Sequence, residues 1–286
     1  RSLARAQGAG KPALHSRTRE VGMNEILARW RLDGSTALIS GASRGIGYAC
    51  ARELAALGAR VLMVARDADA LEAARRELSE EFPACAAQAF AADVGSAEAR
   101  LELFDWIADL NADAGAELSI VVNNVGANQT RAALDYELAE VEALLRTNLL
   151  SAFHLCQLAH PHLAAHGAGA IVNVGSVSGI THVRSGAPYG MSKAALHQLT
   201  RNLACEWAED GIRVNAVAPW YIRTRRTETA LADQEYLDEV LARTPMQRIG
   251  EPHEVAAAVT FLCLPAAGYI SGECIAVDGG FLRYGF

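Results

Sequence analysis

Apolar and polar positions alternate in blocks along the chain from residue 35 onward. Short, almost entirely apolar runs are each followed by a longer segment whose apolar positions recur with the 3.6-residue period of a helix. The runs predict buried strands at 35–40, 60–65, 85–93, 118–124, 170–176, 212–219 and 274–278. The periodic segments predict helices at 46–59, 69–81, 96–114, about 135–166, 189–210 and 252–264.

Apolar strands that alternate with amphipathic helices are typical of a parallel sheet covered on both faces. We therefore predict an α/β, single-domain, Rossmann-type doubly wound sheet of about seven strands, which binds ligands at the carboxyl ends of its strands. The helix over 135–166 is expected to bend or end at Pro161. The polar segment at about 220–250 has no clear place in the sheet, and we expect it to form a substrate lid.

The first 22 residues differ from the rest because they are basic, rich in Ala, Gly and Ser, and without a sustained period. The chain begins with Arg1, and Met23 resembles an ordinary start. We interpret residues 1–22 as vector-derived or upstream sequence or a flexible extension, with a transit-peptide remnant as the alternative. Residues 23–286 suit one domain.

The bulk properties exclude several classes of protein. The chain has 286 residues, 51% of them hydrophobic, and a net charge of −7 with a pI near 5.6. This charge gives no general attraction to nucleic acid or to an anionic membrane. No apolar run approaches the roughly 18–20 residues that a membrane-spanning helix needs.

The cysteines and histidines do not indicate a metal site or a disulfide framework. The six cysteines are scattered and form no CxxC pair, so we expect reduced, mostly buried side chains in a cytoplasmic protein. Four histidines cluster at His154, His160, His162 and His166. Their spacing does not favour a metal site, and a solvated helix end is the preferred interpretation.

A glycine-rich stretch, "SGASRGIG" at residues 40–47, lies between the first predicted strand and the first predicted helix. Gly41, Gly45 and Gly47 are spaced G-x-x-x-G-x-G. Glycines at such a turn let the backbone approach a pyrophosphate, and the helix start supplies free N–H groups. The stretch therefore predicts a dinucleotide site, with a ligand-free turn as the alternative.

The end of the second strand favours NADP(H) over NAD(H). An NAD-binding chain would place an acid there to hold the ribose hydroxyls, but this chain has Ala65 followed by Arg66. Arg66 and Arg44 would clamp a 2′-phosphate. Asp67 weakens this preference if it faces the ribose. We expect it instead to cap the next helix.

Two further strand ends carry polar residues that would lie beside the same ligand. Asp93 and Val94 end the third strand and are candidates for the adenine edge. Asn123, Asn124 and Gly126 end the fourth strand. The alternative, that the two asparagines only shape a turn, agrees equally well with these residues.

Tyr189 and Lys193, in "YGMSK", stand four residues apart at the start of a predicted helix. This spacing puts both side chains on one face, a turn apart. Chance produces such pairs in many helices, so the pair alone does not establish a proton-transfer site.

All these motifs together resemble the short-chain dehydrogenase/reductase family over about residues 32–286. The resemblance is carried by "SGASRGIG", "NNVG", "TNL", Ser176, "YGMSK", "RVNAVAP" and "DGG". The stretches "LTRNLACEWAEDGIRVNAVAPWYIRT" and "FLCLPAAGYISGECIAVDGGF" look especially like the tropinone-reductase branch. One departure is Gly175, which precedes Ser176 where a second serine is common.

The resemblance implies a role for each of four residues. Tyr189 would exchange a proton with the substrate oxygen, and Lys193 would hold the nicotinamide ribose and make the phenol more acidic. Ser176 would hydrogen-bond the substrate oxygen. Asn148 would hold a water that links Lys193 to solvent.

The resemblance also implies the residues that hold cofactor and substrate. The expected cofactor contacts are Gly41, Ser43, Arg44, Gly45, Ile46, Gly47, Arg66, Asp93, Val94, Asn123, Gly126, Tyr189, Lys193, Pro219, Ile222 and Thr224. The expected substrate pocket contains Ser178, Trp220 and Tyr221.

The implied activity is an NADP(H)-dependent interconversion of a small, cyclic ketone and its secondary alcohol. The family resemblance further implies a homodimer or homotetramer. Two alternatives are a 3-oxoacyl-carrier-protein reductase, which would need a basic docking face, and a non-catalytic dinucleotide-binding regulator. The intact set of Asn148, Ser176, Tyr189 and Lys193 argues against the regulator.

Overall fold

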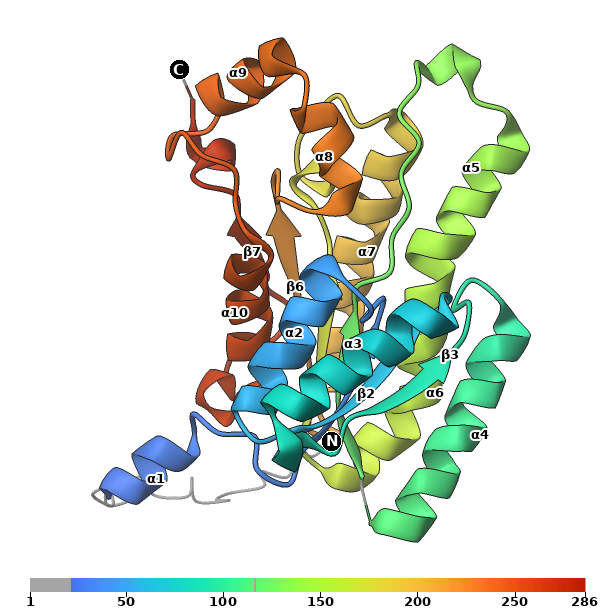
Figure 1. Ribbon diagram of the computed structural model, residues 1–286, viewed down its shortest axis with the longest axis vertical. Coiled ribbons are helices and arrows are strands. Elements are labelled where there is room, and N and C mark those ends of the chain that lie inside the picture. Colours follow the sequence, from blue (N-terminus) through green and yellow to red (C-terminus); the bar gives the residue numbers. More distant parts are fainter. Residues whose placement is uncertain (1–21, 116, 286) are drawn as a thin grey trace, which may run out of the picture.

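The computed structural model describes residues 22–115 and 117–285, so the predicted extension lies outside the described residues apart from Gly22. A parallel sheet runs through the centre of the molecule in the order β3-β2-β1-β4-β5-β6-β7 (Figure 1). Its strands are β1 (Thr36–Ser40), β2 (Arg60–Ala65), β3 (Gln88–Ala91), β4 (Leu118–Asn123), β5 (Gly169–Val174), β6 (Ile212–Pro219) and β7 (Cys274–Val277). The predicted doubly wound sheet is confirmed.

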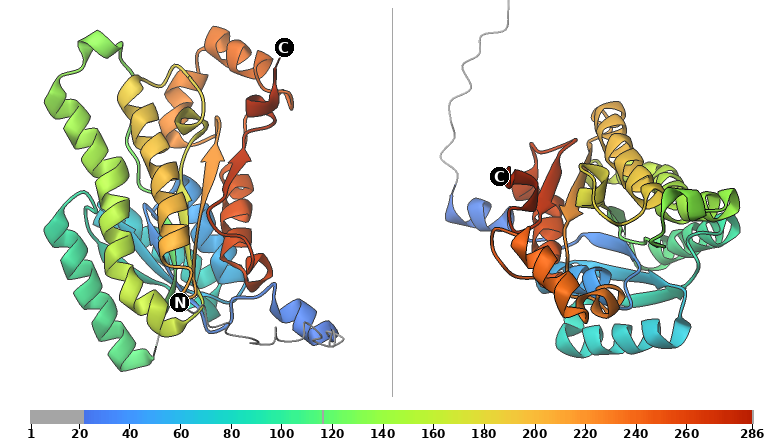
Figure 2. Two further views of the ribbon diagram at one scale, coloured as in Figure 1. Left: turned by 180° about the vertical axis from the view of Figure 1, so that it is seen from behind. Right: turned by 90° about the horizontal axis from the view of Figure 1, so that it is seen from above.

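Helices cover both faces of this sheet (Figures 1 and 2). The helices of the described residues are α1 (Met23–Ala28), α2 (Gly45–Ala56), α3 (Ala68–Glu81), α4 (Ala97–Ala114), α5 (Leu138–Leu145), α6 (Ser151–His166), α7 (Ala187–Glu206), α8 (Arg225–Leu231), α9 (Gln234–Ala242) and α10 (Pro252–Cys263). Among the helices described here, none is both long and apolar enough to cross a membrane.

Successive side chains of each strand enter two different cores. In β1, Ala37 and Ile39 pack with buried residues of α2, α3 and α10, whereas Leu38 packs with residues of α4, α6 and α7. Side chains alternate between faces along a strand, so a strand that is buried on both faces needs apolar residues at every position. This requirement explains the continuous apolar runs in the sequence.

The helical region before β5 runs through Pro161. Helix α6 continues to His166, so of the two predicted outcomes, a bend or an end at the proline, the end is wrong. The neighbouring Ala159 and Leu163 are fully buried, and their packing holds the helix across the missing N–H group. The irregular part lies earlier, in a π-helical turn at Arg146–Leu150 that carries Asn148.

The segment 220–250 contains the two short helices α8 and α9 above the carboxyl ends of the strands (Figure 1). Its ends meet in a bridge between Ile222 and Gly250. Trp220 stacks on Phe281 with ring centroids 3.8 Å apart, and its Nε1 donates to Thr244 Oγ1. The base of the segment is therefore anchored to the body of the protein.

Helix α4 offers a matched test of the core. Leu103 is 1% exposed, whereas Leu101 on the same helix is 49% exposed. We expect Leu103→Ala to lower the free energy of unfolding by about 2–5 kcal/mol, because it removes buried methyl groups and leaves a cavity. Leu101→Ala should change it by less than about 0.5 kcal/mol. Urea unfolding of both variants measures the difference, and equal losses would contradict this assignment of the core.

Candidate active site

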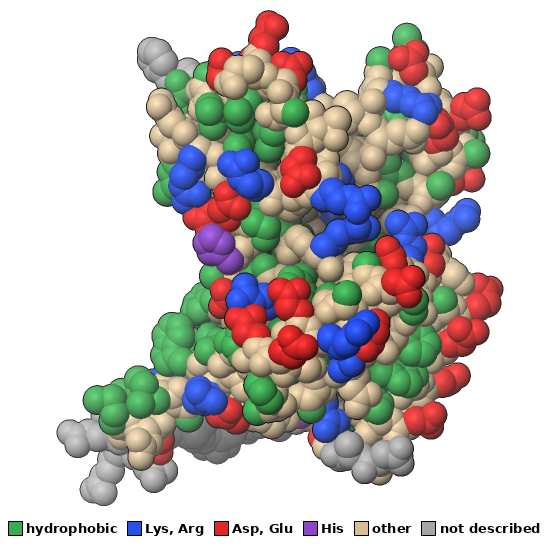
Figure 3. All heavy atoms as spheres, in the orientation of Figure 1, with side chains coloured by type: hydrophobic (Ala, Val, Ile, Leu, Met, Phe, Trp, Pro, Cys, Tyr) green, Lys and Arg blue, Asp and Glu red, His purple; other side chains and the backbone are tan. Residues whose placement is uncertain are grey.

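A cavity of about 820 Å³ opens at the carboxyl ends of the strands, where the sheet order reverses between β1 and β4. Basic side chains gather where the surface is hollowed beside α8 (Figure 3). The predicted site residues that line the cavity are Gly41, Ser43, Arg44, Gly45, Ile46, Arg66, Asp93, Val94, Gly126, Ser176, Tyr189, Lys193, Pro219, Trp220, Ile222 and Thr224. Open α/β sheets bind ligands at this place.

The glycine turn after β1 forms one wall of the cavity. Gly41 and Gly45 have φ values of +68° and +58°, which glycine adopts at little cost. A Cβ at Gly47 would lie 2.2 Å from the Gly41 carbonyl oxygen, so α2 can pack this closely only with glycine there. The N–H groups of the first turn of α2 have no partner within the helix. This cradle fits the pyrophosphate of a dinucleotide.

Asn124 supports the glycine turn, whereas Asn123, the predicted cofactor contact, does not face the cavity. The Nδ2 of Asn124 donates to the carbonyl oxygens of Ser40 and Gly41. Asn123 does not line the cavity, because its Nδ2 points into the core and donates to Asn173 Oδ1 at 2.9 Å. The two asparagines are adjacent and point to opposite faces of the sheet.

At the far end of the cavity the guanidinium of Arg66 is largely exposed. Its closest carboxylate is Asp93, at 3.9 Å. Asp67 is engaged elsewhere, since its Oδ1 accepts a hydrogen bond from Ala70 N and caps α3. The predicted capping role of Asp67 is confirmed, and Arg44 and Arg66 both line the cavity.

Tyr189 and Lys193 lie at the opposite end, on the first turns of α7. Tyr189 is 7% exposed and Lys193 is 3% exposed. The Lys193 Nζ donates to the Val174 carbonyl oxygen at 2.8 Å and lies 5.9 Å from the centre of the Tyr189 ring. Burial, together with the charge of Arg226, lowers the pKa of Lys193 from 10.5 to about 7.

Ser176 and Asn148 flank this pair. Ser176 begins a short turn at the end of β5, and its Oγ accepts a hydrogen bond from Ser178 N. Asn148 does not line the cavity but lies behind Gly126. A Cβ at Gly126 would lie 3.3 Å from Lys193 Nζ and 3.7 Å from Asn148 Oδ1. The π-helical turn therefore brings Asn148 close to Lys193.

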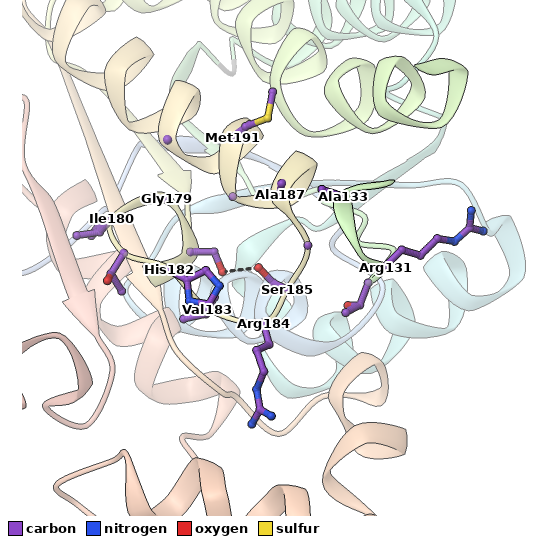
Figure 4. Close-up of a pocket in the computed structure, with 16 residues that line it drawn as sticks. Arg131, Ala133, Gly179, Ile180, His182, Val183, Arg184, Ser185, Ala187 and Met191 are labelled. Atoms are coloured by element: carbon purple, nitrogen blue, oxygen red, sulfur yellow. Dashed lines mark hydrogen bonds between the residues drawn. The ribbon is translucent and has the colours of Figure 1, made fainter. Parts of the chain in front are cut away.

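Two of the three predicted substrate-pocket residues lie outside the cavity. Ser178 lines a second cavity of about 710 Å³, and its Oγ accepts a hydrogen bond from Ser185 (Figure 4). Arg131 and Arg184 extend away from this second cavity at two of its edges (Figure 4). Tyr221 lines neither cavity, because its hydroxyl pairs with that of Tyr236.

Arg225 and Arg226 are cavity residues that are not among the expected site residues. In the sequence they belong to an arginine-rich stretch that agrees equally with attraction of an anionic substrate and with a solvated lid edge. In the structure both line the cavity, and Arg226 Nη1 donates to the Gly126 carbonyl oxygen at 3.0 Å. One hundred residues separate these two partners, so only the folded chain reveals the contact.

The clustered histidines of α6 have separate neighbours. His154 accepts a hydrogen bond from Arg100, His160 pairs with Asp210, and His162 lies 3.4 Å from Asn111. Within residues 22–115 and 117–285, no group of three or more His, Cys, Asp or Glu side chains is arranged to hold a metal ion.

Comparison with known proteins links this geometry to a family. The family model described as enoyl-(acyl carrier protein) reductase matches residues 41–282. A tropinone reductase homolog of Arabidopsis thaliana is 46% identical over 258 residues, which cover 90% of this chain and 96% of the relative.

Among solved structures with the same fold, one contains NADP and another contains NADH. A gluconate 5-dehydrogenase from Burkholderia cenocepacia in complex with NADP and tartrate superimposes with a TM-score of 0.83 and 34% identity, covering 90% of this chain and 99% of that chain. A 7α-hydroxysteroid dehydrogenase complexed with NADH and 7-oxo glycochenodeoxycholic acid gives a TM-score of 0.82 and 33% identity, covering 89% and 96%.

The buried Lys193 predicts a pH-dependent stability of the cofactor-free protein. The pKa of Lys193 is about 7 in the folded protein and 10.5 in the unfolded chain, so between these two pH values the folded protein binds fewer protons than the unfolded chain. The free energy of unfolding therefore rises by up to about 1.4 kcal/mol per pH unit between them. We expect Lys193→Met to flatten this rise in urea unfolding between about pH 7.5 and 9.5.

The exposed Arg76 on α3 supplies the control, and Arg76→Met should leave the pH dependence unchanged. An equally steep rise in Lys193→Met and in the unmodified protein would show that Lys193 is not the group responsible.

Proposed function

The chain belongs to the short-chain dehydrogenase/reductase family of oxidoreductases, and we propose that it interconverts a small, cyclic ketone and its secondary alcohol with NADP(H). The observation that carries this proposal is the convergence of Ser176, Tyr189 and Lys193 on the cavity that also contains the glycine turn. A proton-transfer group thereby lies in the same space as a dinucleotide cradle.

In the proposed reaction Tyr189 donates its phenolic proton to the carbonyl oxygen during reduction and recovers it during oxidation. Ser176 Oγ hydrogen-bonds the same oxygen and fixes its position. Lys193 places a cationic group beside the phenol and so stabilises the phenolate that proton transfer leaves behind. When bound, the nicotinamide supplies or accepts the hydride. Asn148 would order a water next to Lys193 and connect it to solvent.

The preference for NADP(H) rests on Arg44 and Arg66. Both residues line the cavity, and charge-assisted hydrogen bonds from their guanidinium groups to a 2′-phosphate would neutralise them. Asp67, an acid beside the cavity that would favour NAD(H) if it faced the ribose, caps α3 through its Oδ1. Structural relatives bind either cofactor, so the argument depends on the side chains of this chain.

The proposed substrate class rests on an aromatic wall of the cavity, formed by the Trp220 side chain, and on the similarity to tropinone reductase homologs. Trp220 lines the cavity and is held rigidly against Phe281. A compact apolar ring would pack on such a wall. We propose that the segment 220–250 covers this substrate as a lid, with α8 beside the cavity.

We further propose a homodimer or homotetramer in a reducing compartment such as the cytoplasm. Large apolar side chains on α6 and α7 are exposed, including Phe153 at 39% and Met191 at 55%. Assembly would cover them. Most of the cysteines are buried free thiols, as a reducing environment would leave them.

A panel of ketones and alcohols with both cofactors tests the proposed activity. It contains tropinone, simple cyclic ketones, quinuclidinone and an acetoacetyl thioester, and turnover is followed through the absorbance of the reduced nicotinamide. We expect the cyclic ketones to react with NADPH. Preferred turnover of the thioester would support the acyl-carrier alternative, and no turnover of any compound would overturn the proposal.

Replacing Tyr189 by Phe tests the proposed proton donor. We expect Tyr189→Phe to lower kcat at least about 100-fold, because general acid–base catalysis contributes about that much or more. The dissociation constant for NADPH should stay within about twofold. Tyr269→Phe removes a hydroxyl from a fully exposed tyrosine and should leave both quantities unchanged. Retained turnover in Tyr189→Phe would contradict the proposed mechanism.

Replacing Arg66 tests the proposed phosphate clamp. We expect Arg66→Ala to raise the dissociation constant for NADPH about 10- to 100-fold, since it removes a charge-assisted hydrogen bond of about 1.5–3 kcal/mol. Binding of NADH should barely change. The exposed Arg76→Ala provides the control. If the unmodified protein binds both cofactors equally, the clamp does not exist.

A further inference from the structure

His197 is a buried active-site neighbour that the proposed mechanism does not use. It lies on α7 four residues beyond Lys193, as Lys193 lies four beyond Tyr189, so the three side chains follow one face of the helix. His197 is 3% exposed, and its Nε2 has no hydrogen-bond partner in the described part of the chain. Such buried atoms are rare and call for an explanation.

The imidazole ring of His197 occupies the space beside Gly175. A Cβ at Gly175 would lie 2.1 Å from His197 Nε2 and 2.8 Å from its Cδ2. Gly175 is not one of the glycines with a positive φ, so its backbone conformation does not demand glycine. The ring does, because it fills the volume that a side chain at 175 would need.

Gly175 directly precedes Ser176, and the backbone around both residues is held on two sides. The Gly175 N–H donates to the Val217 carbonyl oxygen of β6 at 2.8 Å. The preceding carbonyl, of Val174, accepts the hydrogen bond of Lys193. Hydrogen bonds to β6 and α7 therefore fix the backbone that leads into Ser176, and the His197 ring packs against this backbone at Gly175.

The His197 ring packs against this backbone without adding a charge. Burial and the charges of Lys193 and Arg201 lower the pKa of His197 to about 4, and a smaller effect of the Gly179 backbone opposes them. The strand positions that approach the ring, Gly175 and Val217, bring no charged group. At neutral pH His197 is thus an uncharged side chain that fills space next to the buried ammonium group of Lys193, where a second cation would be costly.

We propose that His197 is a positioning residue which, as a matched pair with Gly175, sets where Ser176 stands relative to Tyr189. The proposal rests on the proposed function, because it assigns Ser176 to the substrate oxygen. A misplacement of about 1 Å in such a constellation costs about 100-fold in rate. The pair would therefore matter to turnover although His197 does not line the cavity and Gly175 offers it no side chain.

The first test adds a Cβ without removing the ring. We expect Gly175→Ala to lower kcat about 10- to 100-fold while the dissociation constant for NADPH stays within about twofold. A crystal structure of this variant should show the Ser176 segment displaced from its place beside Tyr189.

The second test removes the ring as well. We expect Gly175→Ala/His197→Ala to turn over at least about fivefold faster than Gly175→Ala alone, with Ser176 back in place. The kcat of the double variant should stay below that of the unmodified protein, by no more than about tenfold, because the new Cβ still lies 2.9 Å from the Val217 carbonyl oxygen. His197→Asn, which also lacks Nε2 but leaves a smaller cavity, replaces His197→Ala if that variant unfolds.

His162 supplies the matched control. It is a half-buried histidine on α6 that packs on Phe104, away from Gly175. Adding His162→Ala to Gly175→Ala should give no recovery. A His197 double variant no faster than Gly175→Ala, or an undisplaced Ser176 in the Gly175→Ala crystal structure, would overturn the pairing. If the unmodified protein turns over no compound of the panel, the proposed function fails, while the crystal structures still decide on the pair.

Discussion

The site depends on one buried cation held by a main-chain carbonyl. Lys193 is almost fully buried on α7, and its Nζ donates to the carbonyl oxygen of Val174 at the end of β5. A buried ammonium group is tolerated only with such partners, so this hydrogen bond ties α7 to the strand end. Tyr189 shares the helix face, and Ser176 follows the same strand. The position of each proposed catalytic side chain is therefore linked to this contact.

The charge of the cavity follows from its cationic lining. Arg44, Arg66, Arg225 and Arg226 line it together with Lys193 and outnumber the two lining carboxylates, Asp67 and Asp93, of which Asp67 also caps α3. A chain with a net charge of −7 thus concentrates positive charge at one hollow. A ligand with several phosphates would neutralise this charge, which is the physical basis for a dinucleotide rather than a neutral metabolite at this place. The repulsion between Arg226 and Lys193 would be relieved at the same time.

Family membership and substrate rest on different kinds of evidence. The glycine turn, the parallel sheet and the Tyr–Lys pair are properties of a whole family, and relatives with this fold carry names as different as gluconate 5-dehydrogenase and 7α-hydroxysteroid dehydrogenase. Function on a common fold is decided by the side chains around the site. Around this cavity, the lining side chains outside the sheet include those of Trp220, Arg225 and Arg226.

The sequence by itself determined the strands, their order of appearance, the glycine turn and the Tyr189–Lys193 pair. These features are local, since strand alternation, helical period and glycine conformation are encoded within a few residues. Only the tertiary structure decided that Asn124 rather than Asn123 supports the turn, that α6 passes through Pro161, and that Arg226 reaches Gly126. It alone revealed that the His197 ring leaves room only for glycine at 175. Such contacts join residues far apart in the chain, and side-chain packing selects them rather than any local pattern.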